Sequence, residues 1–194
     1  KTGRRVVAGI LAFSLAIVAL PGFLIGGVVT MMVGASESDT CTVPGESEEF
    51  TSEQMGNAQT IIEVGRDLDV SDDGLRVALI VSLVESDLLN RANFTVPESL
   101  SLPHQGHPGS DHDSVGIFQQ RPSSGWGTVS ELMSPKFAAR AFFGGPEGPN
   151  GGSPRGLLDV SGWEAMTAGE AAQTVQVSAF PDRYAERVAD ADKI

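Results

Sequence analysis

The sequence predicts a mainly α-helical domain that follows one N-terminal membrane-spanning helix. Apolar residues recur at helical spacing, and residues typical of helix starts precede several of these stretches. An uncharged apolar run near the N-terminus predicts the membrane helix. We therefore divide the chain into a membrane anchor or signal segment (residues 1–35), a linker (residues 36–50) and a folded domain (residues 51–190).

The N-terminal segment has the features of a membrane anchor. Residues 6–35 carry no charged side chain, and Lys1, Arg4 and Arg5 precede them. A bilayer core of about 30 Å requires about 20 apolar helical residues, whereas the apolar region of a signal peptide has about 7–15. The length favours a retained single-pass anchor in the cell membrane, with a cytoplasmic N-terminus and an extracytoplasmic domain. Cleavage near Ala35, which would release a secreted protein, is the alternative.

The rest of the chain is strongly acidic. Residues 36–194 contain ten Lys and Arg against 25 Asp and Glu, a formal charge of −15. Nucleic-acid binding requires clustered Lys and Arg to neutralise phosphates, so we expect no nucleic-acid partner. One cysteine, Cys41 in the linker, excludes an internal disulfide. No phosphate-binding Gly-rich loop with Lys is present, and we expect no cofactor.

Two helices are predicted at the start of the domain. Thr51 and Gln54 have the spacing of a capping box, and the helix they open should run to about Leu68. Ser71 can cap a second helix. Its apolar stripe at helical spacing consists of Leu75, Ala78, Leu79, Ser82 and Leu83.

The second half of the domain mixes irregular segments with shorter helices. Three prolines interrupt residues 90–113, and residues 114–120 (SVGIFQQ) should form an extended segment or a tight turn. We expect residues 144–156, rich in Gly and Pro, to be an exposed, mobile insertion. Three helices are predicted: one opened by Ser134 and Pro135 and running to about Phe143, one opened by a capping box at Thr167 and running to about Ala179, and a short one from Pro181 that contains Tyr184.

Glu85 is the strongest candidate for a catalytic residue. It lies three residues after Ser82 and seven after Ala78, on the same helical face as the apolar stripe. Burial disfavours an ionised carboxylate and raises its pKa. A carboxylic acid that stays protonated near neutral pH can act as a general acid on a glycosidic oxygen. The alternative is a glutamate at the rim of the helix end, paired or solvated.

Two motifs resemble one enzyme family. Residues 77–86 (VALIVSLVES) resemble the Glu-Ser motif of lytic transglycosylases in the lysozyme superfamily, and residues 114–119 (SVGIFQ) are similar to that family's Gly-Leu-Met-Gln motif. Residues 116–127 (GIFQQRPSSGWG), together with Trp163 and residues 171–184, resemble actinobacterial cell-wall proteins. The resemblance covers about residues 55–188.

The resemblance implies a lysozyme-like fold and an enzyme that cleaves peptidoglycan glycan strands between N-acetylmuramic acid and N-acetylglucosamine. Glu85 would act first as acid and then as base, so one carboxylate would be sufficient. A hydrolase usually requires a second carboxylate, for which Asp111 and Asp113 are candidates. Such an enzyme could remodel the wall or open it for a secretion or conjugation apparatus. A non-catalytic wall-binding or scaffold module on the same framework is the competing interpretation.

The same motifs suggest substrate-binding residues. Gln119 could bond sugar hydroxyls or acetamido groups while the turn at Gly116 gives access, and Trp126 could stack on a sugar face or close a turn. Tyr184 falls where the family often places a tyrosine near the catalytic acid, although the family's Ala-Tyr-Asn-Ala-Gly motif is missing. Asp113 could instead bond backbone amides in a polar turn. The full predicted set is Ser86, Asp113, Ser114, Gly116, Gln119, Trp126 and Tyr184.

All three histidines lie within nine residues, at His104, His107 and His112, and Asp111 and Asp113 are interspersed with them. Imidazoles and carboxylates can bind zinc, but this spacing matches no strong metal signature. We therefore predict a polar loop of the substrate cleft and no metal site.

Overall fold

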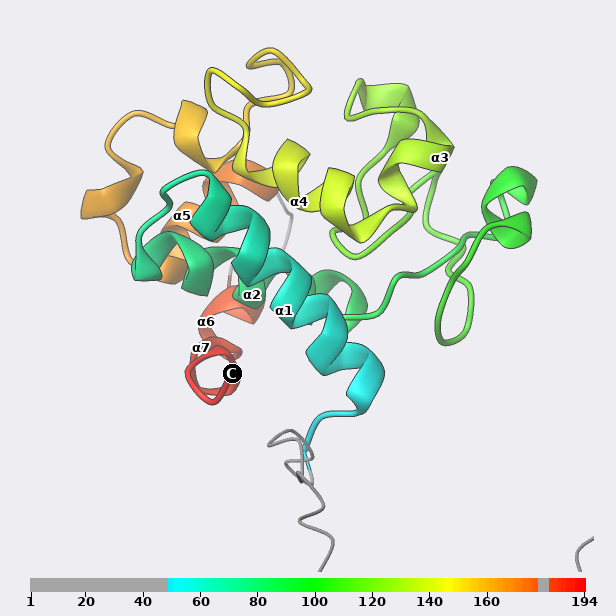
Figure 1. Cartoon of the computed structure of the whole chain (residues 1–194), viewed down its shortest axis with the longest axis horizontal. Coiled ribbons are helices and arrows are strands. Elements are labelled where there is room, and N and C mark those ends of the chain that lie inside the picture. Colours follow the sequence, from blue (N-terminus) through cyan, green and yellow to red (C-terminus); the bar gives the residue numbers. More distant parts are fainter. Residues whose placement is uncertain (1–48, 178–181) are drawn as a thin grey trace, which may run out of the picture. The chain divides into compact units, whose positions relative to one another are not determined.

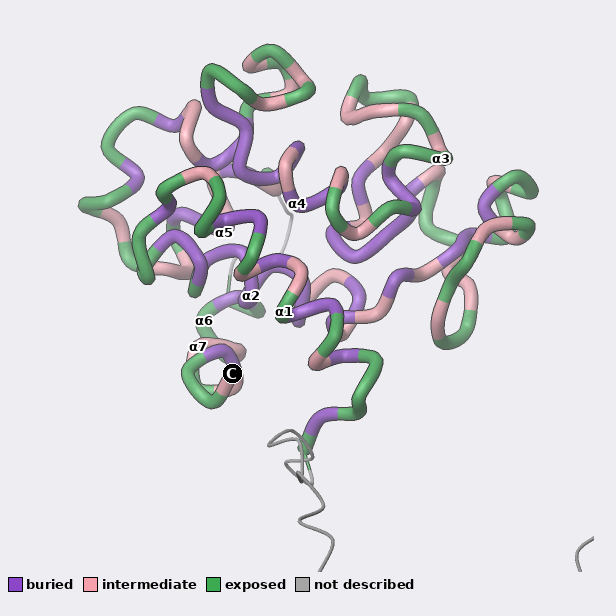
Figure 2. Tube along the Cα trace, viewed as in Figure 1, coloured by how far each residue is buried: buried purple, intermediate pink, exposed green. Residues whose placement is uncertain are grey.

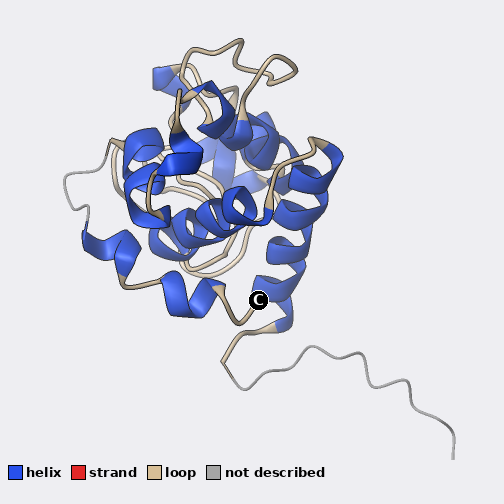
Figure 3. Cartoon of the chain, turned by 90° about the vertical axis from the view of Figure 1, so that its left-hand side faces the viewer, coloured by secondary structure: helices blue, strands red, loops and turns tan. Residues whose placement is uncertain are grey.

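A computed structural model of the chain describes residues 49–177 and 182–194. The described residues belong to one compact unit. They form a mainly α-helical domain without strands, which confirms the predicted class (Figure 3). The membrane helix predicted within residues 1–35, and the linker before residue 49, lie outside the described residues. No helix among the described residues is long and apolar enough to cross a bilayer.

Local capping signals place the first two helices. Helix α1 spans Ser52–Asp67 and begins with the predicted capping box: the Gln54 amide donates to Thr51 Oγ1 (3.3 Å), and the Thr51 amide donates to Gln54 Oε1 (2.8 Å). Helix α2 spans Asp72–Ser86, and Ser71 Oγ accepts from the Gly74 amide. These local bonds satisfy amides that have no partner inside a helix, so both starts could be predicted from sequence.

Helix α2 is the centre of the domain (Figure 1). It packs against α1, α4 (Pro135–Phe143), α5 (Ala168–Gln176), α6 (Asp182–Ala185) and α7 (Val188–Ala191). Figure 2 shows buried residues along α2 and α4, and most residues of α2 are buried. The Phe118 and Phe142 rings stack with centroids 4.5 Å apart and join the segment after α2 to α4. Burying most of α2 fixes its rotation and therefore the direction of Glu85.

The segment between α2 and α4 is mostly irregular, as its prolines predicted. It contains 3₁₀ turns at Pro97–Ser101 and Pro122–Ser124, and the short helix α3 at Val129–Leu132. Isolated β-bridges pair parts of its backbone, such as Arg91 with Gly116 and Val115 with Gln120. The segment has a small core of its own, which consists of Ala92, Val115, Leu132 and Met133.

Two expectations need correction. Helix α5 ends at Gln176, earlier than the predicted end near Ala179, because Val177 adopts a left-handed conformation (φ 49°) that ends the helix. Residues 144–156 are exposed only in the middle, since Gly144, Gly145 and Gly156 are buried. A Cβ atom on Gly156 would lie 2.5 Å from the Gly144 amide nitrogen, so the two ends of this loop pack backbone to backbone.

Candidate active site

Glu85 lies in the last turn of α2 and is half-buried. The helix continues for one more residue, and Asp87 then adopts a left-handed conformation (φ 58°) that ends it. The neighbouring positions on α2 are fixed in the core, so the carboxyl group has a defined position.

A tyrosine from the other end of the domain contacts this carboxyl group. The Tyr184 hydroxyl donates to Glu85 Oε1 at 2.6 Å, across 99 positions of sequence. Tyr184 is fully buried on α6. The distance lies in the range of a charge-assisted O–H···O bond. This bond fixes the orientation of the Glu85 carboxyl group, and Tyr184 lies next to Glu85, where the resemblance placed a tyrosine.

The environment raises the pKa of Glu85 above the ordinary value for glutamate. Burial is the largest cause, because the half-buried site solvates the charged form poorly. The Tyr184 hydrogen bond and the positive charge of Arg183 act in the opposite direction, and the negative charge of Asp111 adds to the increase. The net upward shift favours the protonated form, which a general acid requires.

Glu85 opens into a cavity of about 560 Å³, which we call the Glu85 cleft. This volume is within the usual range for sites that bind small molecules or short oligomers. The lining is mainly polar and comes from four parts of the chain. It consists of Glu85, Asp111, His112, Ser114, Gln119, Gln120, Arg121, Ser124, Trp126, Gln176, Val177 and Arg183.

Residues 114–120 form a tight turn against the end of α2. The Val115 amide donates to the Gln120 carbonyl at 3.0 Å, and Gly116 has φ 79°. A Cβ atom on Gly116 would lie 2.3 Å from the Leu132 carbonyl oxygen, so only glycine fits at this position. Gln119 faces the cleft, and its Nε2 donates to the Gly116 carbonyl at 2.9 Å.

Ser86 has a different place from the one predicted. It is 1% exposed and does not line the cleft. Its hydroxyl lies 2.7 Å from the Ile117 carbonyl oxygen, to which the Ser82 hydroxyl also donates at 3.0 Å. The two serines fasten the turn to α2, so Ser86 positions Gln119 relative to Glu85 and does not contact a ligand in the cleft.

Asp113 is likewise absent from the cleft lining. Arg121 Nε donates to its Oδ1 at 2.6 Å, and the Ser123 amide donates to its Oδ2 at 2.8 Å. Desolvation opposes ionisation, but these hydrogen bonds outweigh it and hold the pKa of Asp113 below its usual range. Asp113 therefore has the role given by the alternative interpretation, a carboxylate bound within a polar turn. Besides Glu85, the acidic residue that lines the cleft is the exposed Asp111.

The structure thus brings together part of the predicted set of catalytic and substrate-binding residues. Glu85, Ser114, Gln119 and Trp126 line one cavity, and Tyr184 contacts Glu85 from behind it. Gly116 supports the turn and does not itself line the cleft. The prediction missed Arg183, which lines the cleft beside Tyr184 and forms no hydrogen bond or ion pair with a described residue. Its position next to Tyr184 in the sequence was the available signal.

The three histidines have separate surroundings. His112 lines the Glu85 cleft, His107 packs edge-on against the Phe94 ring, and His104 lines a different cavity. Among residues 49–177 and 182–194, no group of three or more His, Cys, Asp or Glu side chains is arranged to hold a metal ion.

No protein-family model matches this chain, and no curated protein matches it with significant similarity.

Proposed function

We propose that this protein cleaves the glycosidic bond between N-acetylmuramic acid and N-acetylglucosamine in peptidoglycan, as a lytic transglycosylase. The observation that carries the proposal is the environment of Glu85: a half-buried carboxyl group with a raised pKa at the wall of a polar cleft. The sequence resemblance suggests the substrate, because residues 77–86 and residues 114–119 resemble the Glu-Ser and Gly-Leu-Met-Gln motifs of wall-cleaving enzymes.

The reaction would use Glu85 twice. The protonated acid donates its proton to the oxygen between muramyl C1 and the next sugar, and that C–O bond breaks as positive charge develops at C1. The Glu85 carboxylate then accepts the proton of the muramyl 6-hydroxyl, whose oxygen bonds to C1. The product is a 1,6-anhydromuramyl end, and Glu85 is protonated again.

The state of the other carboxylates favours this route over hydrolysis. Asp113 is engaged by Arg121 and Ser123, so it is poorly placed to activate a water. Asp111 lines the cleft but is exposed, and its Oδ1 is 2.8 Å from His112 Nδ1. A route in which the substrate supplies its own nucleophile needs neither of them. Hydrolysis through Asp111 is the second candidate.

The proposal includes the setting predicted from the N-terminal sequence. An anchor within residues 1–35 would hold the domain outside the cell membrane, beside the wall. In that place the enzyme could serve wall remodelling or a secretion or conjugation apparatus.

Product analysis tests the reaction. The whole chain is incubated with purified peptidoglycan, and the soluble products are analysed by mass. Transglycosylation gives anhydromuramyl ends, and hydrolysis gives reducing ends heavier by one water. Intact strands would indicate a non-catalytic wall-binding module and contradict the proposal.

Two variants assign the catalytic group. Glu85→Gln keeps the size of the side chain but removes the acid, and we expect the rate to fall by about 10²–10⁴-fold. The matched control is Glu63→Gln. Glu63 is an exposed glutamate on α1 that lines neither the Glu85 cleft nor the cavity beside His104. The Glu63→Gln variant should keep full activity. Equal rates for the two variants would remove Glu85 from the mechanism.

A further inference from the structure

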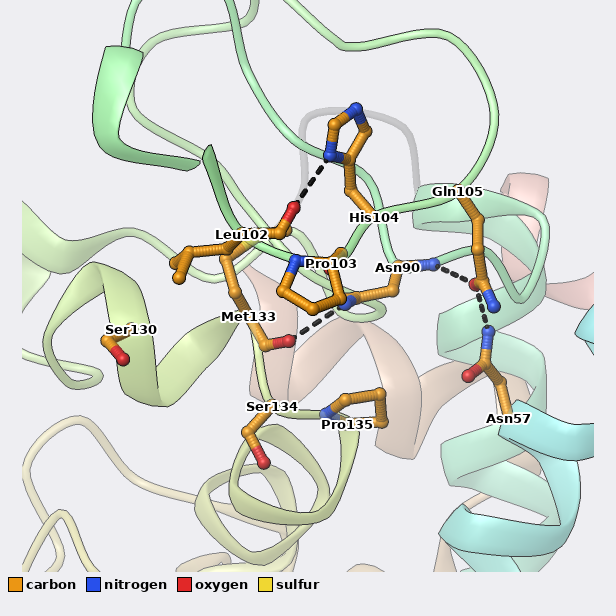
Figure 4. Close-up of a pocket in the computed structure, with 10 residues that line it drawn as sticks. All are labelled: Asn57, Asn90, Leu102, Pro103, His104, Gln105, Ser130, Met133, Ser134 and Pro135. Carbon is orange, nitrogen blue, oxygen red and sulfur yellow. Dashed lines mark hydrogen bonds between the residues drawn. The ribbon is translucent and has the colours of Figure 1, made fainter. Parts of the chain in front are cut away.

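A second cavity shares no lining residue with the Glu85 cleft (Figure 4). It also has a volume of about 560 Å³. We call it the Asn57 pocket. It is lined by Asn57, Asn90, Leu102, Pro103, His104, Gln105, Ser130, Met133, Ser134 and Pro135.

Hydrogen bonds fix the amide side chains of this pocket. Gln105 Oε1 accepts from Asn57 Nδ2 at 2.7 Å and from the Asn90 amide at 2.9 Å (Figure 4). Asn57 Nδ2 also donates to the Leu88 carbonyl, and Asn90 Nδ2 donates to the Met133 carbonyl at 2.8 Å. The polar wall is therefore already ordered, so a ligand would bind it at little cost in conformational entropy.

One acceptor that faces the pocket receives no hydrogen bond from a described residue. Asn57 is 6% exposed, and its amide nitrogen makes two hydrogen bonds, but no described residue donates to its Oδ1. Figure 4 shows this oxygen turned toward the cavity. An oriented carbonyl oxygen at the wall of a cavity can accept a hydrogen bond, so the geometry suits a ligand that carries an N–H or O–H group.

The rim adds two free hydroxyl groups. Ser130 and Ser134 are exposed, and neither side chain forms a hydrogen bond with a described residue. Ser134 occupies the N-cap position of α4 without capping it. The pocket therefore presents one oriented acceptor and two hydroxyls that can donate or accept.

The charge of the lining restricts the ligand. No Lys, Arg, Asp or Glu side chain lines the Asn57 pocket, whereas Glu85, Asp111, Arg121 and Arg183 line the cleft. A ligand with a carboxylate or an ammonium group would find no Lys, Arg, Asp or Glu side chain to pair with, and His104 is the one ionisable side chain in this lining. An N-acetylated sugar matches the lining: its acetamido N–H suits Asn57 Oδ1, its hydroxyls suit the serines, and its methyl group suits the apolar side chains of Leu102 and Met133.

We propose that the Asn57 pocket is a second, non-catalytic site that binds one uncharged N-acetylhexosamine unit of the wall glycan. That the sugar comes from the wall rests on the proposed function. A site of this kind would hold the enzyme on a glycan strand by a contact separate from the Glu85 cleft. Two contacts on one strand raise the effective concentration of substrate at the cleft.

The two cavities carry separate spectroscopic reporters. Met133 lines the Asn57 pocket, and Trp126 lines the Glu85 cleft. The whole chain, labelled with ¹³C at methionine methyl groups and ¹⁵N at tryptophan, is titrated with N,N′,N″-triacetylchitotriose. Met133→Leu assigns the methyl signal, and Trp126→Phe assigns the indole signal. We expect the Met133 methyl signal to shift and saturate, in the wild-type chain and in Glu85→Gln alike.

A blocking variant links the shift to the pocket. Ser134→Trp places a large side chain at the rim, where no capping bond is lost, and should abolish the Met133 shift. The matched control is Ser161→Trp, an exposed serine that lines neither cavity; it should leave the shift unchanged. Denaturation curves check that both variants fold.

Three outcomes would refute the proposal that the Asn57 pocket binds an N-acetylated sugar. These are no Met133 shift, a shift that persists in Ser134→Trp, and a shift with an uncharged N-acetyl dipeptide amide but not with the sugar. The proposed function fails separately, if wild-type protein leaves peptidoglycan uncut. Sugar binding at Met133 would then still stand, and only its assignment to the wall glycan would be lost.

Discussion

Removing the Tyr184 hydroxyl should change both the pH dependence of activity and the stability. In Tyr184→Phe the buried ring stays, but the 2.6 Å bond to Glu85 is lost. That bond lowers the pKa of Glu85, so its loss should raise this pKa further. Activity should fall as pH rises through the pKa of the catalytic acid, and this alkaline limb should move to higher pH in the variant.

The geometry also sets the size of the stability change. A hydrogen bond to a charged group contributes about 1.5–3 kcal/mol, and one between neutral groups about 0.5–1.5 kcal/mol. Because Glu85 is only half-buried, we expect the lower end: a loss of about 1–2 kcal/mol in the free energy of unfolding where Glu85 is ionised. The loss should be smaller at acidic pH. Looser positioning of the acid should lower the maximal rate by about 10–100-fold.

Two assays measure these effects. Release of soluble wall fragments is followed from acid to alkaline pH at constant ionic strength, and urea unfolding is followed at the same pH values. Arg183→Gln should also move the alkaline limb upward, because the Arg183 charge lowers the pKa of Glu85. Arg187→Gln is its control, since Arg187 pairs with Asp87 and Asp190. A limb that stays in place or moves down in Tyr184→Phe would refute this reasoning.

Two further substitutions test the turn beside the cleft. Gly116→Ala should lower the free energy of unfolding by about 2 kcal/mol or more, because φ is 79° and the new Cβ would meet the Leu132 carbonyl. The control is Gly56→Ala on α1, where a Cβ would meet no neighbouring atom. It should raise the free energy of unfolding by about 0.5–1 kcal/mol in the same urea titration. Asp113→Asn should destabilise the protein at neutral pH, and the difference from wild type should shrink as pH falls below about 4, because a depressed pKa contributes stability that is lost on protonation. Asp113→Asn should still cut peptidoglycan, and a loss as large as that of Glu85→Gln would restore Asp113 as a catalytic group.

The helix starts could be predicted because their signals are local. Thr51, Ser71 and Thr167 each accept a hydrogen bond from an amide three residues later, and Pro135 opens α4. Such contacts depend on short sequence patterns and little else.

Contacts across the fold could not be predicted from local patterns. Tyr184 meets Glu85 across 99 residues, and only the family resemblance suggested that pairing. Asp111 and Asp113 are close in sequence, yet only Asp111 lines the cleft. His112, between them, has φ 45°, a conformation that nothing in the sequence indicated. Ser86 was predicted to bind substrate, but in the structure its hydroxyl donates to the Ile117 carbonyl. That carbonyl becomes a neighbour of Ser86 only when the turn packs on α2.

The most direct test of the account is the pKa of Glu85 in the folded protein. The side-chain carboxyl carbons of the glutamates are labelled with ¹³C and titrated by NMR, and Glu85→Gln identifies the relevant signal. We expect the Glu85 carbon to titrate above the value of about 4.3 that is ordinary for glutamate, and its midpoint to agree with the alkaline limb of wall cleavage. A midpoint at or below the ordinary value would contradict the role of Glu85 as a protonated acid.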